Sequence, residues 1–303
     1  MFFSRLSKAL SWDWKIISIF LLPPLFWAGN FVVGRAIRND LPPMTLSFGR
    51  WVIALICILP FAYRGMRQDW RWYLQQPWLI LGISAAGVAA FNSLVYTGLH
   101  YTAVTNGILL NSTIPVLIVV FGAVFYQQKM NVFQTAGLLL SCLGVMTIIL
   151  KGEMENLISM TFSMGDLIVF VAMICWALYT LWLRRIPTDI DRIGLMAVQI
   201  IVGLTVLVPF FVHELMSHPV IHWNQSSILA LGYVGIFPSV IAYLLYNLAV
   251  KLVGAVRSGF SIHLIPVFGT ILSVSILGET LHLYHLIGAF GIFFGILLAS
   301  RKH

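Results

Sequence analysis

Polar side chains recur at helical spacing inside segments of this chain that are otherwise apolar. Asn92 and Tyr96 are four residues apart in the segment FNSLVYTGLHYTAVTNGILLN, residues 91–111, and Asn106 and Asn111 follow them. Residues four apart lie on one face of a helix. A buried amide costs free energy unless a partner satisfies it. Such a face could bind a polar solute, or it could hold two helices together.

The composition places these side chains in a membrane protein. Of 303 residues, 60% are hydrophobic and 9% are charged, and the mean hydropathy is +0.94. Soluble domains carry charge on roughly a quarter of their residues. Apolar stretches near the roughly 20 residues that cross a bilayer recur along the whole chain. The expected fold class is therefore an all-α integral membrane protein in the lipid bilayer, without a soluble domain.

Charges, Pro, Gly and Asn clusters divide the chain into ten expected transmembrane helices. The longest connections are expected at 63–76, 151–164 and 214–225. The expected spans cover residues 16–34, 44–62, 77–99, 103–126, 131–150, 165–184, 192–213, 226–249, 254–278 and 282–300.

The distribution of basic residues predicts the orientation. Thirteen Lys and Arg residues fall on the side that holds both termini, three fall on the other side, and Arg50 and Arg257 lie inside spans. Cytoplasmic loops carry the excess of Lys and Arg, so both termini are expected in the cytoplasm. The same rule accounts for the net charge of +8 without a nucleic-acid partner.

Two registers of self-similarity indicate an internal repeat. At an offset of 149, Trp27-Ala28 meets Trp176-Ala177; at an offset of 151, Pro115-Val116 meets Pro266-Val267. Together they place residues 25–144 onto 174–295. Each copy holds five spans, an odd number, so the copies should enter the membrane from opposite faces. Inverted repeats place a substrate site near the midplane between the two halves.

The repeat gives the amides and phenols of the opening segment counterparts in the second half. At an offset of 151, Asn92 and Tyr96 correspond to Tyr243 and Asn247, the same two chemistries in swapped order. A single Asn in a span often joins two helices. Matched groups in both halves favour a shared central cavity.

Two tryptophans and their neighbours show the same matching. Asn30 lies three residues after Trp27, and Tyr179 lies three residues after Trp176. From the sequence, Trp27 and Trp176 are expected to be the only tryptophans away from the membrane edges. The indoles are expected to face each other across the cavity, where they could bind a planar, apolar or cationic group, or simply pack.

Two titratable side chains inside spans have open roles. Arg50, six residues into the second span, could attract a substrate carboxylate or extend to the outer interface. His263, beside Pro266, could carry a proton or be a hydrogen-bonded structural group. Asn111 lies one turn before the bend expected at Pro115, where it could meet substrate.

These segments resemble the drug/metabolite transporter superfamily, specifically its EamA-type family of ten-helix bacterial transporters. The resemblance lies in FWAGNFVVGRAI, LPPMTLSFGRW, LHYTAVTNGILLNSTIPV, QTAGLLLSCLGVMTII and SIHLIPVFGTILSVSILGETLHLYHLIGAFGIFFGILLAS. One departure is Gln127-Gln128-Lys129, where the family usually has a Gly-Glu pair like Gly278-Glu279. The resemblance implies a bacterial inner-membrane location and export or exchange of amino acids or related metabolites.

The expected organisation has five parts: a cytoplasmic head at 1–15, a first five-helix repeat at 16–150, a periplasmic linker at 151–164, a second repeat at 165–300 and a cytoplasmic tail at 301–303. The expected partner is a small-molecule substrate, with proton coupling left open. No cofactor or metal site is expected, since HELMSH, residues 213–218, lacks zinc-protease spacing. The expected substrate-binding residues are Trp27, Asn30, Arg50, Asn92, Tyr96, Asn111, Trp176, Tyr179, Tyr243, Asn247 and His263.

Two other classes of function compete with a transporter. An intramembrane enzyme would need a buried catalytic pair, and the spans show none. A non-transporting scaffold or sensor is the other alternative, which the matched polar groups argue against.

Overall fold

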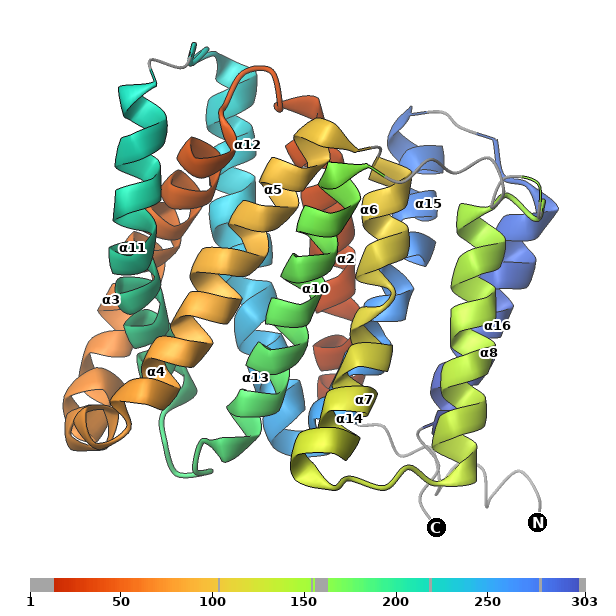
Figure 1. Ribbon diagram of the computed structural model, residues 1–303, viewed down its shortest axis with the longest axis horizontal. Coiled ribbons are helices and arrows are strands. Elements are labelled where there is room, and N and C mark those ends of the chain that lie inside the picture. The colour runs from red at the N-terminus through yellow and green to blue at the C-terminus, as the bar shows by residue number, and fades with distance from the viewer. Residues whose placement is uncertain are drawn as a thin grey trace.

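In the computed structural model, residues 14–102, 104–153, 155, 163–217, 220–277 and 280–299 are described, and every regular element among them is a helix (Figure 1). Eight helices are long and apolar enough to cross a membrane. Two shorter apolar helices, Ser18–Gly34 and Leu283–Ala299, lie in the first and last expected spans. Residues 1–13 of the expected head, the expected tail, most of the linker 151–164, His218 and the Gly278-Glu279 pair lie outside the described residues.

The first half of the chain forms five helical stretches, two of which are broken into shorter elements. In chain order the elements are α2 (Trp14–Ala36), α3 (Pro43–Gln75), α4 (Pro77–Ile83), η1 (Ser84–Ala90), α5 (Phe91–Tyr101), α6 (Val104–Asn111), α7 (Ile114–Tyr126) and α8 (Val132–Ile149).

The second half follows the same order. Its elements are α10 (Met164–Trp182), η2 (Leu183–Arg185), α11 (Arg192–Met216), α12 (Gln225–Ile236), η3 (Phe237–Ile241), α13 (Ala242–Val253), α14 (Ala255–Phe260), η4 (Ser261–Leu264), α15 (Ile265–Leu277) and α16 (Leu283–Ala299).

The second helix is longer than its sequence suggests. Residues 63–76 were expected to be a connection, yet α3 continues to Gln75. Its extension is held by the loop between α10 and α11: Asp191 packs directly over Gly65, where a larger side chain would collide with it, and the Asp191 amide donates to Asp69 Oδ2 at 2.8 Å. The glycine and the charged residues that predicted a connection at 63–76 therefore lie within α3, where Gly65 and Asp69 make tertiary contacts with Asp191.

Helix irregularities occur at matching places in the two halves. The π-helices η1 and η3 directly precede α5 and α13, which carry the matched Asn and Tyr residues. Breaks at residues 112–113 and at the 3₁₀ turn η4 precede α7 and α15, in which Pro115 and Pro266 are the second residues. Proline lacks an amide donor and favours such breaks. The structure thus has helix breaks beside both prolines, where bends were expected.

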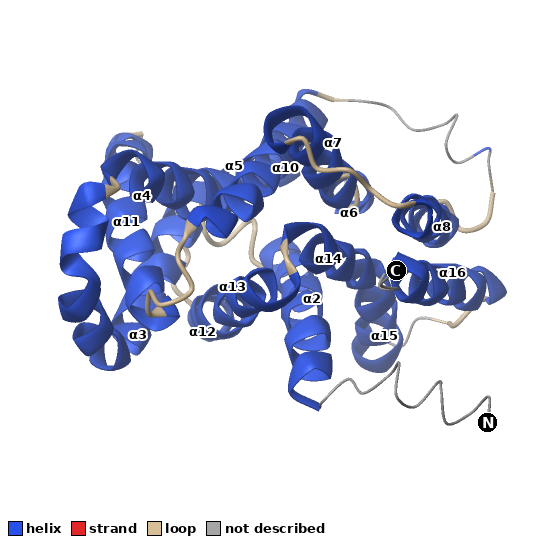
Figure 2. Ribbon diagram, turned by 90° about the horizontal axis from the view of Figure 1, so that it is seen from below, coloured by secondary structure: helices blue, strands red, loops and turns tan. Residues whose placement is uncertain are grey.

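Helix packing also respects the repeat. The main pairs are α8 with α16, α3 with α11, α2 with α13 and α10 with α5. Exchanging the halves converts the α2–α13 pair into α10–α5 and leaves the other two pairs unchanged. Figures 1 and 2 show α8 beside α16 at one edge of the bundle.

Glycines let α8 and α16 approach closely. A Cβ added to Gly144 would lie 2.6 Å from the Gly288 carbonyl oxygen, and one added to Gly295 would lie 2.6 Å from the Gly137 oxygen. Small residues at helix interfaces are how membrane helices pack without a hydrophobic driving force. The two contacts exchange when the halves are exchanged, as expected of a twofold relation.

Candidate functional site

Two pairs of repeat-equivalent residues touch each other at the centre of the bundle. The rings of Trp27 and Trp176 meet edge to face, with centroids 5.1 Å apart. Asn92 Nδ2 donates to the Tyr243 hydroxyl at 3.0 Å. Residues that contact their own counterparts must lie beside the axis that relates the halves. The sequence-matched residues therefore lie where the two halves meet.

A small cavity lies among these residues. Its volume is about 20 Å³, room for about one water molecule, whereas small-molecule sites usually have several hundred Å³. A metabolite could enter only if the helices moved apart. The cavity is lined by Trp27, Asn30, Phe31, Phe91, Asn92, Val95, Asn111, Ile114, Trp176, Ile262 and Ile265.

Arg50 lies beside this cavity and is fully buried, so it does not extend to the interface. Its Nη1 donates to Asn92 Oδ1 at 2.8 Å, to the Tyr96 hydroxyl at 2.5 Å and to Asn30 Oδ1 at 3.3 Å. Its Nε donates to Ser239 Oγ at 2.7 Å. All four partners are neutral, and Nη2 has no partner among the described atoms. A buried cation with only neutral partners is electrostatically incomplete, and an anion would complete it.

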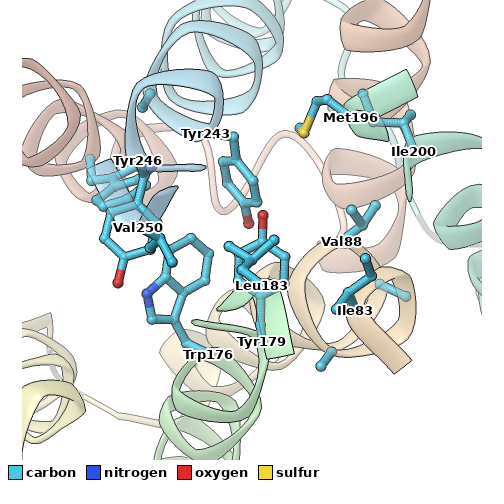
Figure 3. Close-up of a cluster of buried hydrophobic side chains, with 14 of the residues drawn as sticks. Ile83, Val88, Trp176, Tyr179, Leu183, Met196, Ile200, Tyr243, Tyr246 and Val250 are labelled. Carbon is cyan, nitrogen blue, oxygen red and sulfur yellow. The ribbon is translucent and has the colours of Figure 1, made fainter. Parts of the chain in front are cut away.

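Aromatic rings from α10 and α13 form one wall of the site, which we call the aromatic wall: Trp176, Tyr179, Tyr243 and Tyr246 (Figure 3). The Trp176 ring centroid lies 5.1 to 5.3 Å from those of the three tyrosines. Trp27 packs against this wall and is fixed by its Nε1, which donates to the Pro238 carbonyl at 3.2 Å.

Tyr179 of the aromatic wall and Asn247 belong to the predicted set but do not line the central cavity. The Tyr179 hydroxyl donates to Asn247 Oδ1 at 2.7 Å, and Asn247 Nδ2 lies 4.0 Å from Met196 Sδ. In the first half, the Tyr96 hydroxyl donates to Asn30 Oδ1 at 2.8 Å. The two bonds are repeat equivalents in which tyrosine and asparagine have changed places.

His263 is not among the residues that line the cavity. Its Nε2 donates to the Ser112 carbonyl at 3.0 Å, and its Nδ1 lies 2.7 Å from Ser141 Oγ. Ser112 is its repeat equivalent, so the ring joins the two broken helices at their breaks. With both ring nitrogens bonded to the protein, the geometry favours the structural alternative for His263.

Asn111, in contrast, lines the central cavity. Its Nδ2 is buried without a partner among the described atoms. An unpaired buried donor of this kind is rare in folded proteins. It is available to bind a solute.

Sequence reasoning missed two aromatic residues of the site. Trp51 is fully buried and meets Tyr243 edge to face at 5.1 Å, so Trp27 and Trp176 are not the only interior tryptophans and that expectation was wrong. The Arg50 guanidinium carbon lies 5.3 Å from the Trp51 ring centroid. The adjacency of the two in FGRW was an available signal. Tyr246 lies one helical turn after Tyr243, which also could have been noticed.

Comparison with known proteins identifies the family of molecules to which this chain is similar. The model of the EamA-like transporter family matches residues 14–150 and 163–301. An uncharacterized transporter of Bacillus subtilis, YyaM, is 28% identical over 84% of this chain and 82% of its own length. An uncharacterized transporter of Archaeoglobus fulgidus is 28% identical over 93% of this chain and 96% of its own.

More distant similarities extend to plants and to a solved structure. A WAT1-related protein of Arabidopsis thaliana is 24% identical over 89% of this chain and 80% of its own. One crystal structure has a TM-score of 0.74 at 19% identity, with 93% of this chain and 95% of that chain covered. This last likeness concerns the fold alone.

Proposed function

The chain belongs to the EamA-like transporter family of multi-pass membrane proteins, and from this premise we propose that it carries a small organic carboxylate, an amino acid or a related amphipathic compound. Arg50 is proposed to bind the carboxylate. The aromatic wall is proposed to bind the apolar part of the same molecule.

The observation that carries this proposal is the set of contacts around Arg50. A charge near the centre of a membrane span costs about 3 kcal/mol on insertion scales, and such residues mark substrate pathways. Here the guanidinium is fully buried, its four bonds go to neutral groups and its Nη2 has no partner among the described atoms. Arginine binds carboxylates with two parallel hydrogen bonds. Nη2, together with Nη1, could donate these two bonds to the carboxylate of a substrate.

The aromatic residues favour an amphipathic carboxylate over a small hydrophilic one. Trp27 and Trp176 both line the cavity, as do Phe31 and Phe91. Flat aromatic faces bind apolar groups and cations at close range. An α-amino acid with an apolar side chain presents both kinds of group beside its carboxylate.

The proposed mechanism is alternating access between two inverted five-helix repeats, with ten helices crossing the membrane. Matching helix breaks, π-helices and exchangeable helix pairs support it. The central cavity is too small for a metabolite, so the halves must separate during the cycle. We further propose export or exchange across a bacterial inner membrane, with both termini cytoplasmic, as the distribution of Lys and Arg favours.

Reconstituted protein tests the proposal. Proteoliposomes preloaded with an unlabelled compound are assayed for uptake of its labelled form, using amino acids, their decarboxylated amines and their amides. Carboxylates should be exchanged and the amines and amides should not. No exchange of any carboxylate would favour the scaffold or sensor alternative, and conversion of a compound rather than its movement would favour an enzyme.

A further inference from the structure

A second cavity, separate from the central site, lies at one end of the bundle. Its volume is about 290 Å³. The α7–α8 connection, η2 and the α13–α14 turn meet there, at the lower edge of Figure 1 and facing the viewer in Figure 2. This is the end predicted to be cytoplasmic. It is lined by Val119, Gln128, Lys129, Met130, Gln134, Arg184, Val253, Gly254, Ala255, Val256 and Arg257.

Three cations converge on this cavity, and no acidic side chain lines it. Lys129 comes from the first half of the chain, and Arg184 and Arg257 come from two different elements of the second. Among the described residues, none of the three has a hydrogen bond or ion pair to a carboxylate. Like charges gathered without a counter-ion repel one another, and an anion between them would relieve that repulsion.

The uncharged polar groups of the cavity are also donors. Gln134 Oε1 accepts from the Asn131 amide at 3.1 Å, and its Nε2 has no acceptor among the described residues. Gln128 Nε2 is buried without a partner among the described atoms. Two guanidinium groups, an ammonium and two carboxamide NH₂ groups can donate many hydrogen bonds. An anion with several acceptor oxygens, above all a phosphate, suits such a set.

The remaining lining residues are apolar. Val119, Met130 and Val256 pack against the hydrophobic cluster between α8 and α16. The cavity therefore joins a basic rim to an apolar floor. That combination suits an amphiphile that carries a phosphate, and basic clefts between membrane helices on the cytoplasmic side bind lipid headgroups in this way.

We propose that this cavity, which we call the basic cleft, binds a phosphate-bearing anion, either the headgroup of an anionic phospholipid or a soluble phosphate ester. The bound phosphate would bridge Lys129 of the first half to Arg184 and Arg257 of the second. Close by, Ile118 of α7 packs on Gly259 of α14, where a Cβ would lie 2.8 Å from the isoleucine. The anion would thus strengthen the contact between the halves at this end.

The competing explanation is that these cations only orient the chain in the membrane. Arg64, Arg67 and Arg71 provide a matched control, since they are predicted to lie at the same membrane face, are exposed and are not among the cleft's lining residues. If the cations served orientation alone, replacing the three cleft cations and replacing the three control arginines should have the same effect. Only binding in the basic cleft depends on the cations that line it.

Thermal unfolding of the purified protein in detergent with phosphatidylcholine tests the proposal, with phosphatidylglycerol added in one arm and potassium phosphate in the other. Potassium chloride at equal ionic strength is the reference. A ligand that binds only the folded state raises its stability, and we expect the midpoint to rise by about 3 °C in at least one arm. The triple variant Lys129→Gln, Arg184→Gln, Arg257→Gln should lose this rise, and Arg64→Gln, Arg67→Gln, Arg71→Gln should keep it.

The pattern across arms identifies the source of the phosphate. A rise with phosphatidylglycerol alone indicates a lipid headgroup, and a rise with potassium phosphate, with or without the lipid, indicates a soluble ester. If the triple variant does not fold, Gln128→Glu, which places a negative charge in the cleft, should abolish the rise. No rise in either arm, or a rise that both triple variants keep or lose equally, would overturn the proposal.

Discussion

Arg50 and Gln199 occupy equivalent places in the two halves, 149 residues apart, and their surroundings differ. Both are fully buried. Arg50 donates four hydrogen bonds to neutral side chains. Neither Oε1 nor Nε2 of Gln199 has a hydrogen-bond partner among the described atoms. One half thus holds a charge that donates four hydrogen bonds, and the other holds a neutral amide without a hydrogen-bond partner among the described atoms.

The framework around these two residues differs much less. The Tyr96–Asn30 bond of 2.8 Å has its counterpart in the Tyr179–Asn247 bond of 2.7 Å. The architecture is therefore nearly symmetric while its electrostatics is not. This difference indicates that the charge at residue 50 is not needed to build the framework, and it supports the proposal that Arg50 binds an anion.

The largest effect is expected from Arg50→Met. Removing one member of a buried charged hydrogen-bonded pair costs about 2–5 kcal/mol in binding, so carboxylate transport should fall by about 100-fold or more. Stability should change little, because removing a buried charge that lacks a counter-ion offsets the cost of leaving Asn92 Oδ1 without its Arg50 donor. Initial rates in proteoliposomes and the unfolding midpoint measure the two effects. Normal transport by this variant would remove the basis of the comparison.

Trp176→Ala should have the next largest effect, on stability. Its ring contacts both halves, and replacing a buried tryptophan by alanine costs about 3–5 kcal/mol. Trp223, which is 58% exposed, provides the control, and Trp223→Ala should change stability by less than about 0.5 kcal/mol. Unfolding in mixed detergents measures both. Equal effects would show that the aromatic wall contributes little to joining the halves.

The pair Tyr96→Phe and Tyr179→Phe tests the asymmetry between matched hydroxyls. Tyr96→Phe removes a partner of Arg50, and transport should fall about 10-fold, as for a charged hydrogen bond worth about 1.5 kcal/mol. Tyr179→Phe leaves Asn247 Oδ1 unpaired, which should cost stability about 1–3 kcal/mol with little change in transport. Rates and midpoints are measured for both variants. Similar losses of transport in both would contradict a special role for the first half.

Gln199→Met should have the smallest effect, and in the opposite direction. Burying an amide without partners costs about 1–3 kcal/mol, so the apolar variant should be as stable as the wild type or slightly more so. Thr180→Val is the control, since the Thr180 hydroxyl lies 3.1 Å from the Tyr246 hydroxyl and its loss should cost about 1 kcal/mol. Denaturation midpoints distinguish them. A destabilised Gln199→Met would mean that the amide has partners in solution.

Much of the fold was predictable because long apolar stretches in a sequence predict membrane helices. The repeat is visible in the matched pairs Trp27/Trp176 and Pro115/Pro266. The gathering of Asn92, Tyr96 and their counterparts followed from the repeat, since equivalent residues near a twofold axis come together.

Other features depend on tertiary packing and could not be predicted in this way. The continuation of α3 to Gln75 depends on Asp191, more than a hundred residues away. Ser239, a partner of Arg50, has Val88 as its repeat equivalent and so left no matched signal. The size of the central cavity depends on how side chains of both halves interdigitate, which spacing along one chain does not report.

The central claim is that Arg50 recognises a carboxylate, and the most direct measurement compares one transported acid with its amide in the wild type and in Arg50→Gln. The wild type should prefer the acid by about 100-fold, which corresponds to about 2.7 kcal/mol of coupling. Arg50→Gln should transport the two with nearly equal efficiency. If Arg50→Gln keeps the wild-type preference for the acid, Arg50 does not bind the carboxylate and the account is wrong.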